Sequence, residues 1–152
     1  MSKTKTIKNA LKEVLAGIEY QGEPAFVDVL GSTDGEFSGY PSVRLLPERI
    51  ENEKAAMSQN DRAVHFKAIV HLELESADSI EENIIDHMTD LTDLIMDALD
   101  EGDYQNTLSG IDPTIGTYIM NATDAAWDVV DSKAGSLLLL VISISASYSK
   151  DL

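Results

Sequence analysis

The chain has 152 residues, of which 43% are hydrophobic and none is cysteine. This length is enough for one domain with a substantial core, and the lack of cysteine excludes a disulfide framework and a thiolate metal site. The longest apolar run, residues 137–142, is far shorter than the roughly 20 residues that span a bilayer. The lysine-containing start lacks the apolar run of a secretory signal. We therefore expect a soluble, intracellular protein with no membrane contact.

The formal net charge is −16, and it is unevenly distributed. The segment 68–132 contains 16 acidic residues and no lysine or arginine, whereas the first 12 residues contain four lysines and no acid. Because an acidic surface repels phosphate, that part of the protein is not expected to bind nucleic acid directly. The charges predict a molecule with an acidic side and a basic amino-terminal region.

The first part of the chain is predicted to contain a helix and two short strands. Residues 3–19 place apolar side chains at helical spacing, with the lysines on or near the wet face. Residues 25–30 read as a short apolar strand, and "YPSVRLLP" (40–47), bracketed by prolines, fits a short strand near a sheet edge. Residues 48–62 are polar without clear alternation, so we interpret them as a long polar arm.

Strict alternation marks the next segment, "AVHFKAIVHLELE" (63–75), which has one core face and one mostly wet face. A central helix is predicted over residues 79–99, because Ser79 and Glu82 form an S-x-x-E capping box. At 1.5 Å per residue this helix is about 31 Å long. Its core stripe consists of Ile80, Ile84, Met88, Leu91, Ile95 and Leu99.

Two short strands (114–122 and 125–131) are predicted before a long C-terminal strand over residues 136–148. The order of elements is thus helix, three strands, helix, and two or three strands. This order predicts a single α+β domain over residues 1–152, with a mainly antiparallel sheet and helices packed on one face.

The two faces of the C-terminal strand differ. Its even positions are apolar throughout, which is typical of a core face. On the odd face Leu137, Leu139 and Val141 give way to serines, so the first half of the strand is expected to be covered on both sides. The cover is either a helix of this chain or a neighbouring subunit. These three residues are the candidate oligomer interface.

No catalytic, cofactor or metal motif is found. Segment 31–39 has glycines but lacks the G-K-[ST] of a phosphate-binding loop, and no G-x-S-x-G motif occurs. His65 and His71 lie about 20 Å apart along one strand, too far to bind one ion, and His87 is expected at the surface or core boundary. Trp127 is interpreted as a core or interface residue. We expect no enzyme activity, no cofactor and no metal.

The central helix carries a stripe of carboxylates with no cation to balance them. Like charges at i, i+4 destabilise a helix by roughly 0.2–0.5 kcal/mol per pair. One interpretation is a solvated face that keeps the protein soluble. The other is a functional surface, which either meets the basic amino-terminal helix of another copy or lines a channel with negative potential. The stripe is formed by Glu82, Asp86, Asp90, Asp93 and Asp97.

The series of elements resembles that of a known family. An amphipathic helix, a short strand ending near residue 30, the "YPSVRLLP" strand, a polar arm and a long alternating strand form the first half. A capped helix, a tryptophan-bearing segment and a final "LLLLVISISASYS" strand complete it. Together they resemble the tail-terminator, or head-tail joining, proteins of long-tailed bacteriophages. The resemblance covers nearly the whole chain and rests on element order rather than on one motif.

The resemblance implies a non-enzymatic virion protein, assembled in the host cytoplasm, that forms a hexameric ring on the tail tube and docks the head connector, or stopper, protein. Arg49, Lys54 and Arg62 of the arm would contact the tube or connector. DNA would pass through without specific binding, because carboxylates facing the lumen repel phosphate. The alternatives are another phage neck or minor tail component, or a small ligand-binding α+β regulatory module.

Overall fold

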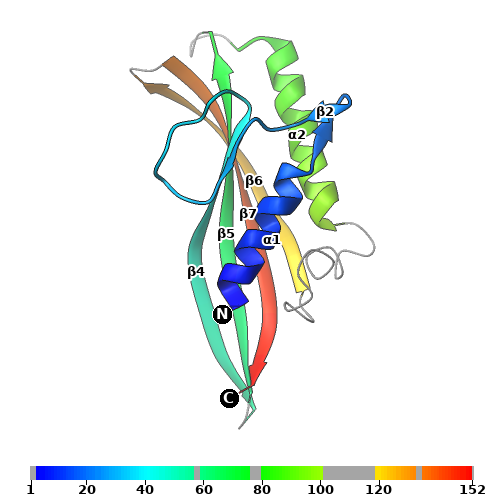
Figure 1. The fold of residues 1–152 in the computed structure, drawn as a ribbon, viewed down its shortest axis with the longest axis vertical. Coiled ribbons are helices and arrows are strands. Elements are labelled where there is room, and N and C mark those ends of the chain that lie inside the picture. Colours follow the sequence, from blue (N-terminus) through cyan, green and yellow to red (C-terminus); the bar gives the residue numbers. More distant parts are fainter. Residues whose placement is uncertain (1–2, 57–58, 76–79, 101–118, 133–134, 152) are drawn as a thin grey trace.

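Four long strands form most of the structure, and two helices lie on one side of them (Figure 1). The predicted α+β class is confirmed, because a five-stranded mixed sheet and these helices form a single compact domain. The computed structural model describes residues 3–56, 59–75, 80–100, 119–132 and 135–151.

The main sheet has the strand order β3-β4-β5-β7-β6. The two hairpins β4–β5 and β6–β7 meet along the central β5–β7 pair, and all the long strands pair antiparallel. A short β3 adds a parallel pair to one end of β4. The strands are β3 (Val29–Leu30), β4 (Ser42–Ala56), β5 (Gln59–Leu74), β6 (Ile119–Ser132) and β7 (Gly135–Asp151).

Helix α1 (Lys3–Ala16) forms where helical spacing predicted it. Its buried side includes Ile7, Leu11 and Leu15, which recur every three or four residues and face the sheet. The lysines of the helix lie outside this buried line and are partly exposed or exposed. Gly17 follows the helix, and its amide donates to the carbonyl of Glu13 at 3.0 Å.

Helix α2 (Glu82–Asp100) is the predicted central helix. The carbonyl of Glu81 accepts the amides of Ile84 and Ile85 at 3.1 and 3.2 Å, so the helix begins one residue after Glu81. The predicted cap residue Ser79 lies outside the described residues. The buried core side chains of this helix are Met88, Leu91, Ile95 and Leu99.

The core lies between the helices and one face of the sheet. On β5 the alternating residues predicted from the sequence are buried, with Phe66 fully buried near the middle of the strand. The even positions of β7 are buried in the same way. Each buried leucine, isoleucine, valine or phenylalanine among them contributes roughly 1.5–3 kcal/mol, because its apolar surface is removed from water. The buried β7 residues are Leu138, Leu140, Ile142, Ile144, Ala146 and Tyr148.

Residues 48–62, expected to form a polar arm without strand structure, instead lie in β4 and β5 as the distal part of their hairpin. Residues 57–58 lie outside the described part of the chain. A register shift between Pro47 and Arg49 moves the alternation by one residue and hides it from a search for period two. The strand expected over 40–47 is therefore much longer.

A second register shift explains why one strand forms where two were predicted. The described part of segments 114–122 and 125–131 forms the single strand β6 rather than two strands. The shift lies between Ala122 and Asp124, where the strand bulges and its alternation changes phase. Residues 114–118 lie outside the described residues.

A small two-stranded sheet, absent from the sequence prediction, follows α1. It pairs β1 (Glu19–Tyr20) with β2 (Glu23–Pro24). The turn between them places Gln21 at φ 55° and Gly22 at φ 82°, a backbone shape typical of tight hairpins. This hairpin brings Tyr20 against α2. No helix in the described part of the chain is long and apolar enough to cross a membrane.

Candidate functional site

The face of the main sheet opposite the helices, called the bare face below, carries a patch of apolar side chains. Side chains alternate along a strand and paired residues share a face, so the register of β5, β7 and β6 places the side chains of the patch on the same face. Ala126 is exposed and the others are partly exposed, and the predicted interface residues form one column of the patch. The bare-face patch consists of Ile69, Ala126, Val130, Leu137, Leu139 and Val141.

One border of the patch is formed by loop 31–40. Phe37 of this loop contacts His71 edge-on, with 4.9 Å between ring centroids, and the Arg44 guanidinium lies 4.6 Å from the centre of the Phe37 ring. Arg44 therefore holds the loop at the sheet edge. It donates to three backbone carbonyls, those of Ser32, Asp34 and Gly35, at 2.8, 3.1 and 2.6 Å.

His71 is half-buried beside this loop, and burial lowers its pKa below the ordinary value. The positive charge of Arg44 lowers the pKa further. Nδ1 of His71 donates to the carbonyl of Ile69 at 3.1 Å, which acts in the opposite direction. A lowered pKa favours the neutral ring at neutral pH.

The distal hairpin, defined as residues 48–56 of β4 and 59–62 of β5, extends beyond α1 (Figure 1). The structure does not bring its three predicted contact residues onto one surface. Arg49 pairs with His65 and lies on the bare face, whereas Arg62 lies on the side of the helices. Lys54 shares the helix side with Arg62.

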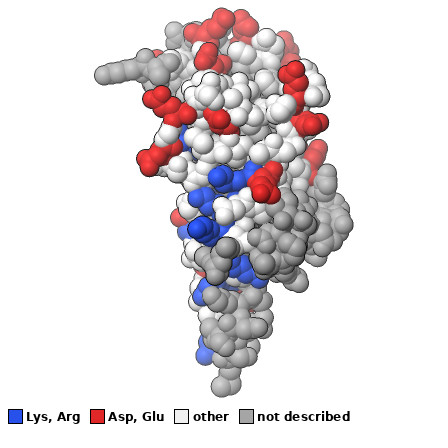
Figure 2. Space-filling model, in the orientation of Figure 1, with Lys and Arg blue, Asp and Glu red and all other residues white. Residues whose placement is uncertain are grey.

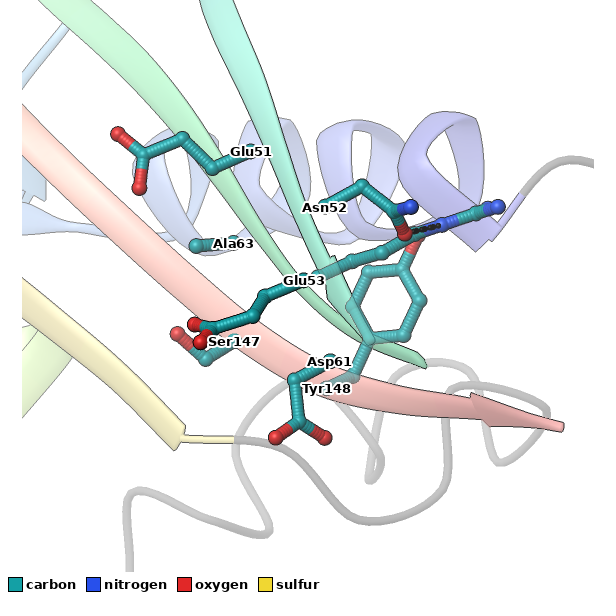
Figure 3. Close-up of a pocket in the computed structure, with 8 residues that line it drawn as sticks. Glu51, Asn52, Glu53, Asp61, Ala63, Ser147 and Tyr148 are labelled. Carbon is teal, nitrogen blue, oxygen red and sulfur yellow. Dashed lines mark hydrogen bonds between the residues drawn. The ribbon is translucent and has the colours of Figure 1, made fainter. Parts of the chain in front are cut away.

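The bare face of the distal hairpin is mainly acidic. Arg49 pairs with Glu51 at 3.1 Å, although both side chains are 60% exposed, so this ion pair contributes little to stability. Glu51, Glu53 and Asp61 extend their carboxylates away from the Tyr148 ring (Figure 3). They border an open hollow of about 600 Å³.

A groove between the start of α2 and strand β6 is a second uncovered apolar surface, which the sequence analysis did not identify. Trp127 is 55% exposed there, Ile85 45% and Val129 37%. Trp127 pairs with Leu140 on the core side of the sheet, but the groove separates it from the helix. The volume is about 450 Å³, and the lining residues are Ile80, Ile85, Met88, Trp127, Asp128, Val129 and Leu138.

A signal for this groove was present in the sequence. After the bulge, Ala125, Trp127 and Val129 alternate with polar or small residues, which places them on one face of β6. The bulge position was needed to tell which face, and the sequence alone did not supply it. Trp127, interpreted as core or interface, lies at the margin of the core with much of its ring uncovered.

The acidic stripe lies on the exposed side of α2. All five carboxylates are on exposed residues, and one of them, Asp90, accepts a hydrogen bond of 2.9 Å from the Tyr20 hydroxyl. The Tyr20 ring stacks on His87 at 4.7 Å between centroids. Burial lowers the pKa of His87, while Asp90 acts in the opposite direction. His87 thus lies at the core boundary.

Opposite charges occupy different regions of the same surface. Figure 2 shows acidic side chains over the upper half of the molecule, at its upper end and on both edges, and basic ones mainly in a column that runs down below them. Lys8 is one of the four lysines of the basic amino-terminal region, and its Nζ donates to the carbonyl of Gly31 at 2.6 Å. The separation of acidic and basic residues along the sequence is therefore also present on the folded surface.

The described residues contain no group of three or more His, Cys, Asp or Glu side chains placed to hold a metal ion. Their most distinctive surfaces are the bare-face patch, the groove beside Trp127 and the acidic stripe. Comparison with protein-family models and with curated protein sequences gave no match.

Proposed function

We propose that this chain is a structural protein of a phage virion, a tail terminator that forms a hexameric ring, caps the tail tube and joins it to the head connector. It acts by assembly rather than by catalysis. The proposal rests on the element order that resembles this family and on the surfaces of the folded chain. Its partners are further copies of the chain, a tail tube protein and a connector or stopper protein.

The observation that carries the proposal is the bare-face patch. An antiparallel sheet with one free face normally alternates apolar and polar residues, so that the outer face is polar. Here Leu137, Leu139 and Val141 are apolar on the outer face, next to Ile69 of β5. A contiguous apolar patch on a folded surface is typical of a protein contact. A subunit interface that buries this patch accounts for its composition.

The acidic stripe is assigned to the ring lumen. DNA passing through a ring is repelled by carboxylates, and no counterions are released to favour binding. Neutralising Glu82, Asp86, Asp90, Asp93 and Asp97 together is then expected to slow DNA ejection and reduce infectivity. Unchanged ejection and infectivity would remove this part of the proposal.

The mass of the protein in solution tests the ring directly. We expect a hexamer by sedimentation or native mass spectrometry, either for the free protein or after addition of tail tubes, with rings visible by electron microscopy. Leu139→Asp should abolish this species while the circular dichroism spectrum remains that of the folded chain. Leu139→Met, which keeps the apolar surface, is the matched control.

The same measurement separates the alternative functions. A dimer that a small molecule stabilises favours the ligand-binding regulatory module. A persistent monomer, both free and in the presence of tail tubes, contradicts a ring-forming role. A hexamer found elsewhere in the neck or tail by immunolabelling favours another neck or minor tail component.

A further inference from the structure

The large apolar side chains exposed on the described surface fall into two groups on opposite edges of the sheet. One group belongs to the groove between α2 and β6, the outermost strand on one edge. The other belongs to β4 and the segment before it, on the opposite edge. The first group is Ile85, Trp127 and Val129, and the second is Val27, Tyr40 and Ile50.

The groove has an apolar floor and an acidic surrounding. Asp128 borders it but pairs with Leu139, so its side chain is on the bare face. Asp131 is exposed and pairs with Ser136, so it lies on the same side of β6 as Trp127 and Val129. Glu81, another exposed residue, precedes the helix that forms one wall. The whole segment 68–132, which supplies most of the groove, contains no lysine or arginine. A complementary partner therefore presents an apolar side chain flanked by cations.

The helix side of the distal hairpin has this composition. Ile50 pairs with Val64 and is 55% exposed. Lys54 and Arg62 lie on the same side of the hairpin, and Arg62 donates from Nε to the Asn52 side chain at 2.9 Å. The acidic residues Glu51, Glu53 and Asp61 are on the other side. The helix side thus combines an exposed isoleucine with two cations.

The hairpin and the groove of one chain lie far apart. The distal hairpin is at one end of the long axis, while α2 begins near the other end, so the hairpin points away from its own groove (Figure 1). Because the hairpin surface and the groove are different surfaces, a contact between them joins copies head to tail. This is the heterologous kind of interface that can close into a ring.

We infer that the helix side of the distal hairpin of one copy docks into the groove of the next, with Ile50 against Trp127 and with Lys54 and Arg62 near Asp131 and Glu81. This inference rests on the proposed ring and identifies the contact that closes it. Val27 and Tyr40 lie outside the strands, in the segment before β4, and are not assigned to the groove. The bare-face patch forms a second contact between copies of the chain.

Cysteine cross-linking tests the contact cleanly, because the natural chain contains no cysteine. Two variants, Ile50→Cys and Val129→Cys, are mixed and oxidised. We expect a disulfide-linked dimer from the mixture and none from either variant alone. The double variant should give a ladder of linked species ending at the ring size. Val27→Cys is a matched control, since Val27 is 52% exposed and Ile50 55%, and it should not link to Val129→Cys.

Trp127 gives an independent readout, because it is the single tryptophan of the chain. Its emission should shift to shorter wavelength on assembly, since the exposed ring becomes covered. Arg62→Glu should weaken self-association about tenfold or more, and adding a second variant, Asp131→Lys, to the mixture should restore much of it. Arg49→Glu, on the other side of the hairpin, is the control and should leave the emission shift unchanged.

The outcomes distinguish this inference from the proposed function. A hexamer that forms without the Ile50–Val129 cross-link and without a change in Trp127 emission overturns the docking contact and leaves the ring intact. Linking of Val27→Cys to Val129→Cys in equal yield also overturns it. A chain that stays monomeric under all conditions removes both. Cross-linking that produces open filaments rather than rings supports the contact and overturns the closed ring.

Discussion

The hydroxyl of Tyr20 donates a hydrogen bond of 2.9 Å to the Asp90 carboxylate and so joins two elements that are 70 residues apart in the chain. The same ring stacks nearly parallel on His87, with an angle of 18° between the planes. One polar and one aromatic contact therefore hold the β1–β2 hairpin against α2.

This hydrogen bond is the main reason that the pKa of Tyr20 lies above its ordinary value, with burial and the charge of Asp90 as further causes. We expect Asp90→Ala to bring that pKa back toward about 10. Each protein and its Tyr20→Phe counterpart are titrated by ultraviolet absorbance. The difference between the two curves gives the titration of Tyr20 alone. Asp93→Ala, on the same stripe, is the control. An equal fall with that variant would show that general charge, rather than the hydrogen bond, sets the pKa.

Stability is expected to decrease as the pH is lowered through the titration range of His71. Burial lowers the pKa of His71 in the folded chain below its ordinary value of 6.5. Within this range the unfolded chain binds more protons, so the free energy of unfolding falls as the pH falls. The contribution of His71 is full above about pH 6.5 and is lost as the pH drops through the folded pKa.

His71→Gln should therefore show a shallower decline of the urea midpoint between about pH 7.5 and pH 5.5 than the natural chain. Circular dichroism at the higher pH first establishes that the variant is folded. Parallel declines of the two proteins would mean that His71 does not contribute. Because burial also lowers the pKa of His87, the urea midpoint of the variant is expected to keep a smaller dependence on pH.

Periodicity predicted the elements that bury a continuous face. Val64 to Leu74 on β5 and the even residues of β7 alternate without interruption, so their core side followed directly from the pattern. The register shift between Pro47 and Arg49 interrupted the alternation of β4, and the distal hairpin was missed there. Its strands are held by backbone pairing, which leaves little trace in side-chain polarity.

The candidate surfaces were predicted in part for a similar reason. Leu137, Leu139 and Val141 were identified because apolar residues on both faces of one strand are visible in the sequence. The groove beside Trp127 depends on where α2 begins relative to β6, and no local pattern encodes that distance. Arg49 and Arg62 looked equivalent in the sequence, but their opposite positions follow only from the register with β5.

Neighbouring leucines of β7 should respond differently to the same substitution. Leu140 is fully buried beneath the helices, so Leu140→Ala is expected to lower the free energy of unfolding by about 2–5 kcal/mol. Leu139 lies on the bare face and is partly exposed. Leu139→Ala should cost about 1 kcal/mol or less in the monomer. Urea denaturation of both variants at a concentration too low for assembly measures the difference, and equal losses would contradict the assignment of faces.

Arg44 should be hard to replace because its guanidinium serves three carbonyls of one loop at once. Lysine has one compact charge and does not reproduce this fork, so Arg44→Lys is expected to cost about 1–2 kcal/mol. Hydrogen exchange in loop 31–40 should accelerate. Arg49→Lys, which changes only an exposed ion pair, is the matched control and should cost about 0.5 kcal/mol or less. Unchanged exchange in the loop would show that Phe37 alone holds it.

The two ends of the acidic stripe should respond in opposite directions to loss of charge. Glu82 lies in the first turn of α2, where the partial positive charge of the helix end favours a carboxylate, whereas Asp97 lies in the last turn, where it is disfavoured. Glu82→Gln is therefore expected to destabilise the chain by about 0.3–1 kcal/mol, and Asp97→Asn to stabilise it by a similar amount. Both effects should shrink as salt is raised, since the side chains are exposed. Thermal unfolding at low and high ionic strength measures them. Stabilisation by both substitutions would show that repulsion along the stripe outweighs the helix dipole. Carboxylates at both ends of the stripe would then destabilise the monomer.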